Sequence, residues 1–227
     1  MINIARFTFN IFSENTYVIW DGSGEAVIID AGCSNTAEQE RLAEFIRTKG
    51  IKPVLALNTH AHPDHMAGVG FVIDRYSVPF AVSSDDSALL AQMPQTGLKY
   101  NFRIPQITID RDLKTEHRIA FGQTAIEVIP SPGHSEGSVC FYIEQSGVLF
   151  SGDTLFRGSI GRTDLPGGDY DVLMHSILDN LLPLGRDVKV YPGHGETTSI
   201  GNEADSNPFI TEVLDGGFNK PYDEDEN

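Results

Sequence analysis

The spacing of apolar and polar residues predicts short strands and helices along the whole chain. Alternation with a period of two predicts strands, and apolar positions at helical spacing predict helices. Thr36 and Gln39 form the expected capping box of the first helix. In the first part of the chain we expect strands at 7–11, 16–20, 26–29, 52–57 and 79–82, and helices at 36–49, 69–73 and 83–92.

The second part repeats this style after a stretch, 93–111, that is rich in loop signals. Pro94 and Pro105 are expected to break regular structure there. Beyond it we expect strand pairs at 118–121 with 124–129 and at 138–144 with 148–151, a helix at 169–182, a strand at 187–191 and a final helix opening at 207–209. Two successive sets of paired strands, each followed by helices, predict an α+β fold with two sheets face to face and helices outside.

Composition limits the possible partners. The chain has 227 residues, 40% hydrophobic and 21% charged, which is ordinary for a soluble globular protein. We predict one domain over 1–215 and a solvated acidic tail over 216–227. The formal net charge of -16 makes nucleic acid an unfavourable partner.

The sequence also indicates where the protein resides. It has no apolar run of 18 residues, and its N-terminus lacks a basic start followed by a long apolar stretch. We therefore expect neither a membrane span nor a secretory signal. Cys33 and Cys140 have no ligand-like spacing and are expected to be reduced and structural, which is consistent with a cytoplasmic protein.

The candidate chemistry begins in the turn that follows the predicted strand at 52–57. That turn reads His60-Ala61-His62-Pro63-Asp64-His65, so that four side chains able to bind metal lie within six residues. Neutral imidazoles and carboxylates are ligands that Zn²⁺ accepts, and often Fe or Mn as well. Packing does not explain such a turn, and we predict a metal site here.

Three further candidates follow strand ends beside a glycine. They are His134, Asp153 and His194. Taken singly, each has a simpler interpretation as a surface or capping residue. Five of the seven histidines lie in such turns, however, and only His117 and His175 do not. Because strand ends can bring distant residues to one edge of a sheet, we expect a joint site.

Together these motifs resemble the metallo-β-lactamase superfamily, in which a His-x-His-x-Asp-His motif precedes a distal His, an Asp and a final His. The resemblance runs from Glu14 to about Phe209. It implies an αββα four-layer sandwich with two mixed sheets and two divalent metal ions at one edge, either zinc or alternatively iron or manganese. The implied ligands are His60, His62 and His134 for one ion, Asp64, His65 and His194 for the other, and Asp153 as the bridge.

The segment from Phe150 to Asp164 is similar to the glyoxalase II, or hydroxyacylglutathione hydrolase, branch of that family. His62 in place of a glutamate argues against the flavin-linked di-iron branch. Asp153 in place of Cys or Ser argues against true β-lactamases. An acidic stretch follows His194 where glyoxalase II has a basic helical domain, so the short forms without that domain are the better match.

The resemblance implies hydrolysis of a small thioester, such as S-lactoylglutathione, by a metal-bridging hydroxide that Asp64 positions. Arg162 falls where glyoxalase II has a basic residue for the glutathione carboxylate. A salt bridge from Arg162 to Asp164 is the structural alternative. An anionic substrate could also meet a basic mouth formed by Lys99, Arg103, Arg157 and Arg162, with Tyr100 and Phe102 interleaved.

Other functions fit the same residues. A persulfide dioxygenase of this fold holds one Fe²⁺ through two histidines and an aspartate, which would here be His60, His134 and Asp153. The Gly-His-Gly setting of His194 favours hydrolysis instead. Other small esters, lactones and phosphodiesters are alternative substrates. A metal-stabilised binding module is disfavoured, because seven ligands exceed a closed four-coordinate site. The oligomeric state is left open.

Residues beside the ligands also have predicted roles. Asp30 and Thr59 are polar residues at the ends of predicted strands. We expect them to orient the imidazoles from behind, with a turn or cap role as the alternative.

Overall fold

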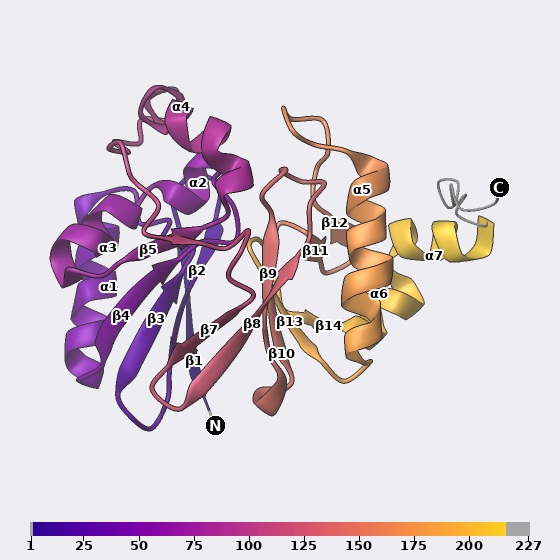
Figure 1. Ribbon diagram of the computed structural model, residues 1–227, viewed down its shortest axis with the longest axis horizontal. Helices are drawn as coiled ribbons and strands as arrows, with labels where there is room; N and C mark the ends of the chain where they lie inside the picture. Colours follow the sequence, from indigo (N-terminus) through magenta and orange to yellow (C-terminus); the bar gives the residue numbers. More distant parts are fainter. Residues whose placement is uncertain (1, 217–227) are drawn as a thin grey trace.

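The computed structural model describes residues 2–216, whose main strands form two six-stranded mixed sheets (Figure 1). Of the predicted acidic tail, 216–227, residue 216 ends the last described helix and residues 217–227 lie outside the described residues. The first sheet has the order β1 (Asn3–Phe9), β2 (Glu14–Trp20), β3 (Glu25–Ile29), β4 (Lys52–Leu57), β5 (Phe80–Val82) and β6 (Arg111–Asp112). The second has the order β14 (Thr198–Ser199), β13 (Lys189–Pro192), β10 (Val148–Gly152), β9 (Val139–Ile143), β8 (Thr124–Pro130) and β7 (Arg118–Phe121). A small hairpin joins β11 (Leu155–Phe156) to β12 (Ser159–Ile160).

Helices cover the outer face of each sheet, which gives the predicted αββα layers (Figure 1). The first sheet carries α1 (Thr36–Lys49), α2 (Pro63–Met66), α3 (Val69–Tyr76) and α4 (Ser87–Leu98), with the short 3₁₀ turn η1 (Ser84–Asp86) before α4. The second carries α5 (Tyr170–His175), the π-helical segment η3 (Ser176–Leu181), the 3₁₀ turn η4 (Leu182–Leu184), α6 (Ile200–Ser206) and α7 (Pro208–Gly216). Another 3₁₀ turn, η2 (Glu144–Ser146), joins β9 to β10.

The side chains of β2 show how the layers are held together. Val18 belongs to the apolar cluster under the helices, whereas Tyr17 and Ile19 belong to the cluster between the two sheets. A strand buried on both faces is apolar throughout, which explains the unbroken run Tyr17–Trp20. A third cluster, which contains Leu149 of β10, lies under the second set of helices.

Two expectations about helices need correction, and one helix was not expected. The first helix begins at Thr36 as predicted, but its cap is Asn35, whose side chain accepts a hydrogen bond from the Glu38 amide. Pro94 does not break the chain, because α4 runs through it to Leu98. Packing of Leu90, Met93 and Gly97 against the core outweighs the hydrogen bond that proline removes. The helix α6 was not predicted.

A buried carboxylate connects turns of the two sheets. Asp21, after β2, accepts hydrogen bonds from the Gln123 amide at 2.6 Å and the Thr124 hydroxyl at 2.9 Å. Burial by itself would raise the pKa of Asp21, but these bonds and those from Ser23 lower it to about 2. The ionised carboxylate is therefore the form that joins the two sheets.

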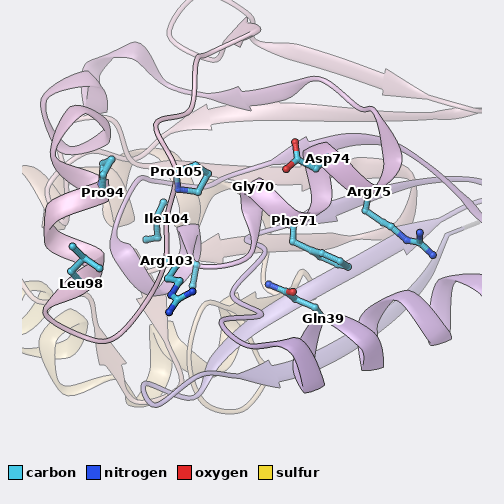
Figure 2. Close-up of a pocket in the computed structure, with 11 residues that line it drawn as sticks. Gln39, Gly70, Phe71, Asp74, Arg75, Pro94, Leu98, Arg103, Ile104 and Pro105 are labelled. Carbon is cyan, nitrogen blue, oxygen red and sulfur yellow. The ribbon is translucent and has the colours of Figure 1, made fainter.

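Other features of residues 2–216 bear on the predictions. Cys33 and Cys140 are buried free thiols. No helix in the described part of the chain is long and apolar enough to cross a bilayer. A cavity of about 750 Å³ lies on the helical side of the first sheet, between α1, α3 and the segment after α4 (Figure 2). Arg103 lines this cavity together with Phe71 and Leu98.

Candidate metal centre

Loops at the ends of several strands bring all seven predicted ligands together. The turn from His60 to His65 follows β4 and contains α2, and His134 lies in the loop after β8. Asp153 follows β10, and His194 follows β13. The side chains gather into three overlapping groups, each with potential ligand atoms within 4.8 Å of one another. The groups are His60, His62 and His134; His60, His65 and Asp153; and Asp64, His65 and His194.

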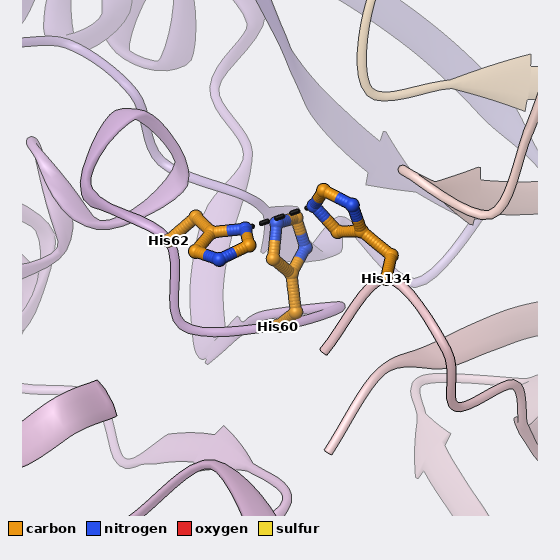
Figure 3. Close-up of side chains that lie close together, drawn as sticks. All are labelled: His60, His62 and His134. Carbon is orange, nitrogen blue, oxygen red and sulfur yellow. Dashed lines mark hydrogen bonds between the residues drawn. The ribbon is translucent and has the colours of Figure 1, made fainter. Parts of the chain in front are cut away.

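The first group consists of three buried imidazoles. His62 Nδ1 and His134 Nε2 lie 2.8 Å apart, and a dashed line marks this contact in Figure 3. The opposite nitrogens are held from behind, since His60 Nδ1 contacts the Thr59 hydroxyl at 3.0 Å and His134 Nδ1 donates to the Arg162 carbonyl at 2.8 Å. His60 Nε2 is buried and has no hydrogen-bond partner among the described residues. Three nitrogens directed to one point are the donor set of a divalent cation.

The group of Asp64, His65 and His194, called the second group below, adds carboxylates to the centre. His194 Nε2 lies 3.2 Å from Asp64 Oδ2, and His65 Nε2 lies 3.8 Å from the same oxygen. Asp153 stands between the two groups, because its Oδ2 is 3.5 Å from the Nε2 atoms of both His134 and His194. Its buried Oδ1 lies 3.4 Å from His65 Nε2 and has no hydrogen bond of normal geometry within residues 2–216. Asp153 therefore lies between the imidazoles of His134 and His194.

Electrostatics divide the histidines. Burial, reinforced by neighbouring imidazoles, lowers the pKa of His60 well below its ordinary value and that of His62 to about 4. Burial acts the same way on His65, but the carboxylates of Asp153, Asp64 and Asp30 outweigh it and raise the pKa of His65. His60 and His62 are therefore neutral at neutral pH, whereas the carboxylates around His65 attract positive charge. Both properties suit bound cations.

Asp30 and Thr59 lie behind the ligands, where the sequence predicted them. Asp30 Oδ1 accepts a hydrogen bond from the Thr59 amide at 2.7 Å, and its Oδ2 accepts one from the Thr59 hydroxyl at 2.8 Å. The same Oδ2 lies 3.1 Å from His65 Nδ1. The two residues thus contact the rear nitrogens of His60 and His65, which fixes the direction of the front nitrogens.

Sequence reasoning did not identify the role of Asp86. This buried carboxylate accepts hydrogen bonds from the Ala61 amide at 2.8 Å, the Ser135 hydroxyl at 3.0 Å and the Gly137 amide at 2.8 Å. It therefore connects the loop of His60 and His62 to the loop of His134. Its place just after β5, at another strand end, was the available signal.

A cavity of about 420 Å³ opens over the candidate ligands. Arg162 lines it, but the guanidinium is exposed and makes two 2.7 Å bonds to Asp164. Arg157 is exposed and is absent from the described lining. The apolar part of the wall was not predicted as a unit and consists of Phe12, Pro63, Tyr100, Phe156, Ile160 and Leu165.

The predicted basic mouth is only partly assembled. Lys99 is exposed, Phe102 is buried, and Arg103 lines the separate cavity of Figure 2. Phe12 instead comes from the turn between β1 and β2, and its ring packs edge-on against Tyr100 with centroids 4.9 Å apart. Two large apolar residues, Ile11 and Phe12, in a hairpin turn were the signal for this wall.

Comparisons with known proteins agree with this geometry. Residues 10–194 match the model of the metallo-beta-lactamase superfamily. The chain is 35% identical to hydroxyacylglutathione hydrolase GloC of Haemophilus influenzae, over 92% of this chain and 98% of that protein. It is 32% identical to the probable metallo-hydrolase YqgX of Bacillus subtilis, over 82% and 87%.

Solved structures give the same result. The BLEG-1 B3 metallo-beta-lactamase superposes with a TM-score of 0.85 and 36% identity, over 92% of this chain and 100% of that one. TTHA1623, solved in a di-iron-bound form, has a TM-score of 0.79 and 35% identity, over 90% and 99%. The strand-end ligands, the layered fold and these matches lead to one conclusion: the chain belongs to the metallo-beta-lactamase superfamily.

Proposed function

We propose that this protein is a dinuclear metal-dependent hydrolase that cleaves a small thioester, with S-lactoylglutathione as the reference substrate. The observation that carries the proposal is the position of Asp153 between two groups of ligands, under an open cavity. A closed structural site would need four ligands and no access. The 35% identity to GloC supports the thioester as the substrate class.

The residues present fit two divalent cations. His60, His62 and His134 would hold one, and Asp64, His65 and His194 the other, with Asp153 shared. When bound, such ions supply an activated water at neutral pH and polarise the scissile carbonyl. Zinc, iron and manganese are all compatible with histidine and carboxylate ligands.

The protein's own groups then determine which molecules reach that centre. Asp64 faces the cavity with Oδ2 3.2 Å from His194 Nε2, and its carboxylate could also position a water. The wall of Phe12, Tyr100 and Phe156 favours an apolar portion of the substrate. Arg162 at the rim can bind a carboxylate if that carboxylate displaces Asp164. These features support a compact anionic thioester rather than a polymer.

Turnover of S-lactoylglutathione by the purified, metal-replete protein tests the proposal. We expect His62→Ala and Asp153→Ala to abolish hydrolysis. His117→Ala is the control, because His117 is exposed in the loop before β7 and does not line the cavity over the candidate ligands. If both site variants hydrolysed S-lactoylglutathione as fast as the wild type, the assignment of these residues to the catalytic metal centre would be refuted.

The same preparation distinguishes the oxidoreductase alternative. A persulfide dioxygenase would bind one iron and consume O₂ with glutathione persulfide. The proposal expects two metal ions per chain and no O₂ uptake. If the protein bound one metal ion per chain and consumed O₂, its function would be oxidation rather than hydrolysis.

A further inference from the structure

We infer that Asn15 is a positioning residue for His194, and that its side chain determines whether the second group of ligands can hold a metal ion. This inference rests on the two-metal centre proposed above. Asn15 lies on β2 of the first sheet, whereas His194 follows β13 of the second. The side chain of Asn15 is 1% exposed and makes no direct contact with the candidate metal ligands among the hydrogen bonds described.

Hydrogen bonds from Asn15 enclose the loop that carries His194. Its Nδ2 donates to the Pro192 carbonyl at 3.0 Å and to the Gly195 carbonyl at 2.9 Å, on the two sides of His194. Its backbone amide donates to the Gly193 carbonyl at 2.7 Å. One residue therefore fixes three carbonyls of a four-residue loop.

The chemistry of these contacts requires a primary amide. Two carbonyls need two N–H donors on one nitrogen, and the remaining oxygen, Asn15 Oδ1, accepts a hydrogen bond from the Thr8 hydroxyl at 3.2 Å. An aspartate has nearly the same shape, but it would place a carboxylate oxygen against the carbonyl oxygens of Pro192 and Gly195. Of these, the Pro192 carbonyl is buried, whereas the Gly195 carbonyl is partly buried and also accepts a hydrogen bond from Arg6 Nη1 at 3.1 Å. Such an unpaired, repulsive contact is costly in a buried site.

The opposite side of the loop contacts the rest of the centre. The Gly193 amide donates to the Gly152 carbonyl at 2.8 Å, next to Asp153. His194 itself donates from Nδ1 to the Phe12 carbonyl at 3.1 Å, which directs Nε2 toward Asp64. The orientation of His194 thus depends on the first sheet, through Asn15 and the turn after β1. The first group, with His60, His62 and His134, has no such bond to Asn15 in the described structure.

Two variants and a matched control test the inference. Asn15→Ala removes both donors, and Asn15→Asp keeps the shape. Tyr17→Phe is the control, since the Tyr17 hydroxyl also donates to the Pro192 carbonyl, at 2.7 Å, but does not reach Gly195. Metal-free protein is titrated with Zn²⁺ against a competing chelator, and bound zinc is counted by elemental analysis. Urea unfolding of each metal-free variant reports folding separately.

We expect Asn15→Ala and Asn15→Asp to lower the affinity for the second zinc ion by about 10–100-fold and to leave the affinity for the first unchanged. At a free zinc concentration that gives two ions in the wild type, they should hold one. Tyr17→Phe should lose stability to a similar extent yet keep two ions. If Asn15→Ala does not fold, Asn15→Asp carries the test.

Two results would overturn the inference. The Asn15 variants could bind both ions with unchanged affinity, or they could lose affinity for both ions equally, which would indicate a general structural role. A wild type that binds one ion would overturn it together with the dinuclear proposal. A wild type that binds two ions without hydrolysing thioesters would contradict only the proposed function, because the role of Asn15 is measured by zinc binding.

Discussion

Gly193 lies directly against the candidate metal centre, and a single added methyl group there should weaken metal binding. A Cβ at this position would overlap the Asp153 carboxylate and lie 2.7 Å from His65 Cε1. Gly193 does not have a left-handed backbone, so Gly193→Ala adds a steric contact and no backbone strain. The perturbation therefore falls mainly on the Asp153 carboxylate and the His65 imidazole, with a further close contact of 3.1 Å to the Gly152 carbonyl carbon.

The magnitude follows from the cost of overpacking. An extra methyl group in a filled site costs about 1–3 kcal/mol. In the metal-free protein the Asp153 carboxylate can turn away, so most of this cost falls on the metal-bound state. Because about 1.4 kcal/mol corresponds to tenfold in affinity, we expect metal binding to weaken by about 5- to 150-fold. The unfolding free energy of the metal-free protein should change much less.

A chelator-competition titration with Zn²⁺ measures the affinity, and urea unfolding measures the stability of the metal-free form. Gly147→Ala is the matched control, because Gly147 has φ of 60° and nothing within 4 Å of an added Cβ. That variant should lose about 1–2 kcal/mol of stability from backbone strain and keep its zinc. Unchanged zinc affinity in Gly193→Ala would refute the placement of Asp153 beside it.

Three further outcomes are expected. Thr59→Val removes the hydroxyl behind His60 and should weaken zinc binding by about 10–100-fold in the same titration; an unchanged affinity would assign Thr59 to the turn alone. The folded-state pKa of Asp21, about 2, lies below its ordinary value of 3.8, so its stabilisation is nearly complete above about pH 4 and is lost as the pH falls through 2. Urea unfolding of Asp21→Asn should therefore show a loss of about 1 kcal/mol at pH 7, after allowance for solvent screening, and almost none at pH 2; a constant difference would contradict this. Arg162→Ala should raise KM for an anionic thioester about two- to five-fold, because an exposed charge pair that solvent screens contributes little; an unaltered KM would leave the pair with Asp164 as its only role.

The sequence predicted the parts of the fold that depend on local pattern. Strand-end glycines beside His134, Asp153 and His194 were informative because the turn and the polar side chain lie in one short segment. The prediction that Pro94 breaks the helix was wrong, because tertiary packing extends α4 through this residue. Local propensity carries no information about that packing.

Contacts between segments distant in the sequence could not be predicted from the local pattern of residues. Arg103 is close to Tyr100 in sequence, yet the two line different cavities because the chain turns after α4. Phe12 and Asp86 reach the centre from other strand connections, and nothing in their own segments indicates which loops they meet. Their roles follow from how the two sheets pack.

The ligands belong to both halves of the sandwich, and this affects how the protein comes apart. His60 and His62 follow a strand of the first sheet, whereas His134 follows a strand of the second. A cation held by all three is a cross-link that closes a long loop, much as a disulfide does. Separation of the halves must then break coordination bonds, so the lifetime of the loaded protein in denaturant should follow the rate of ion release.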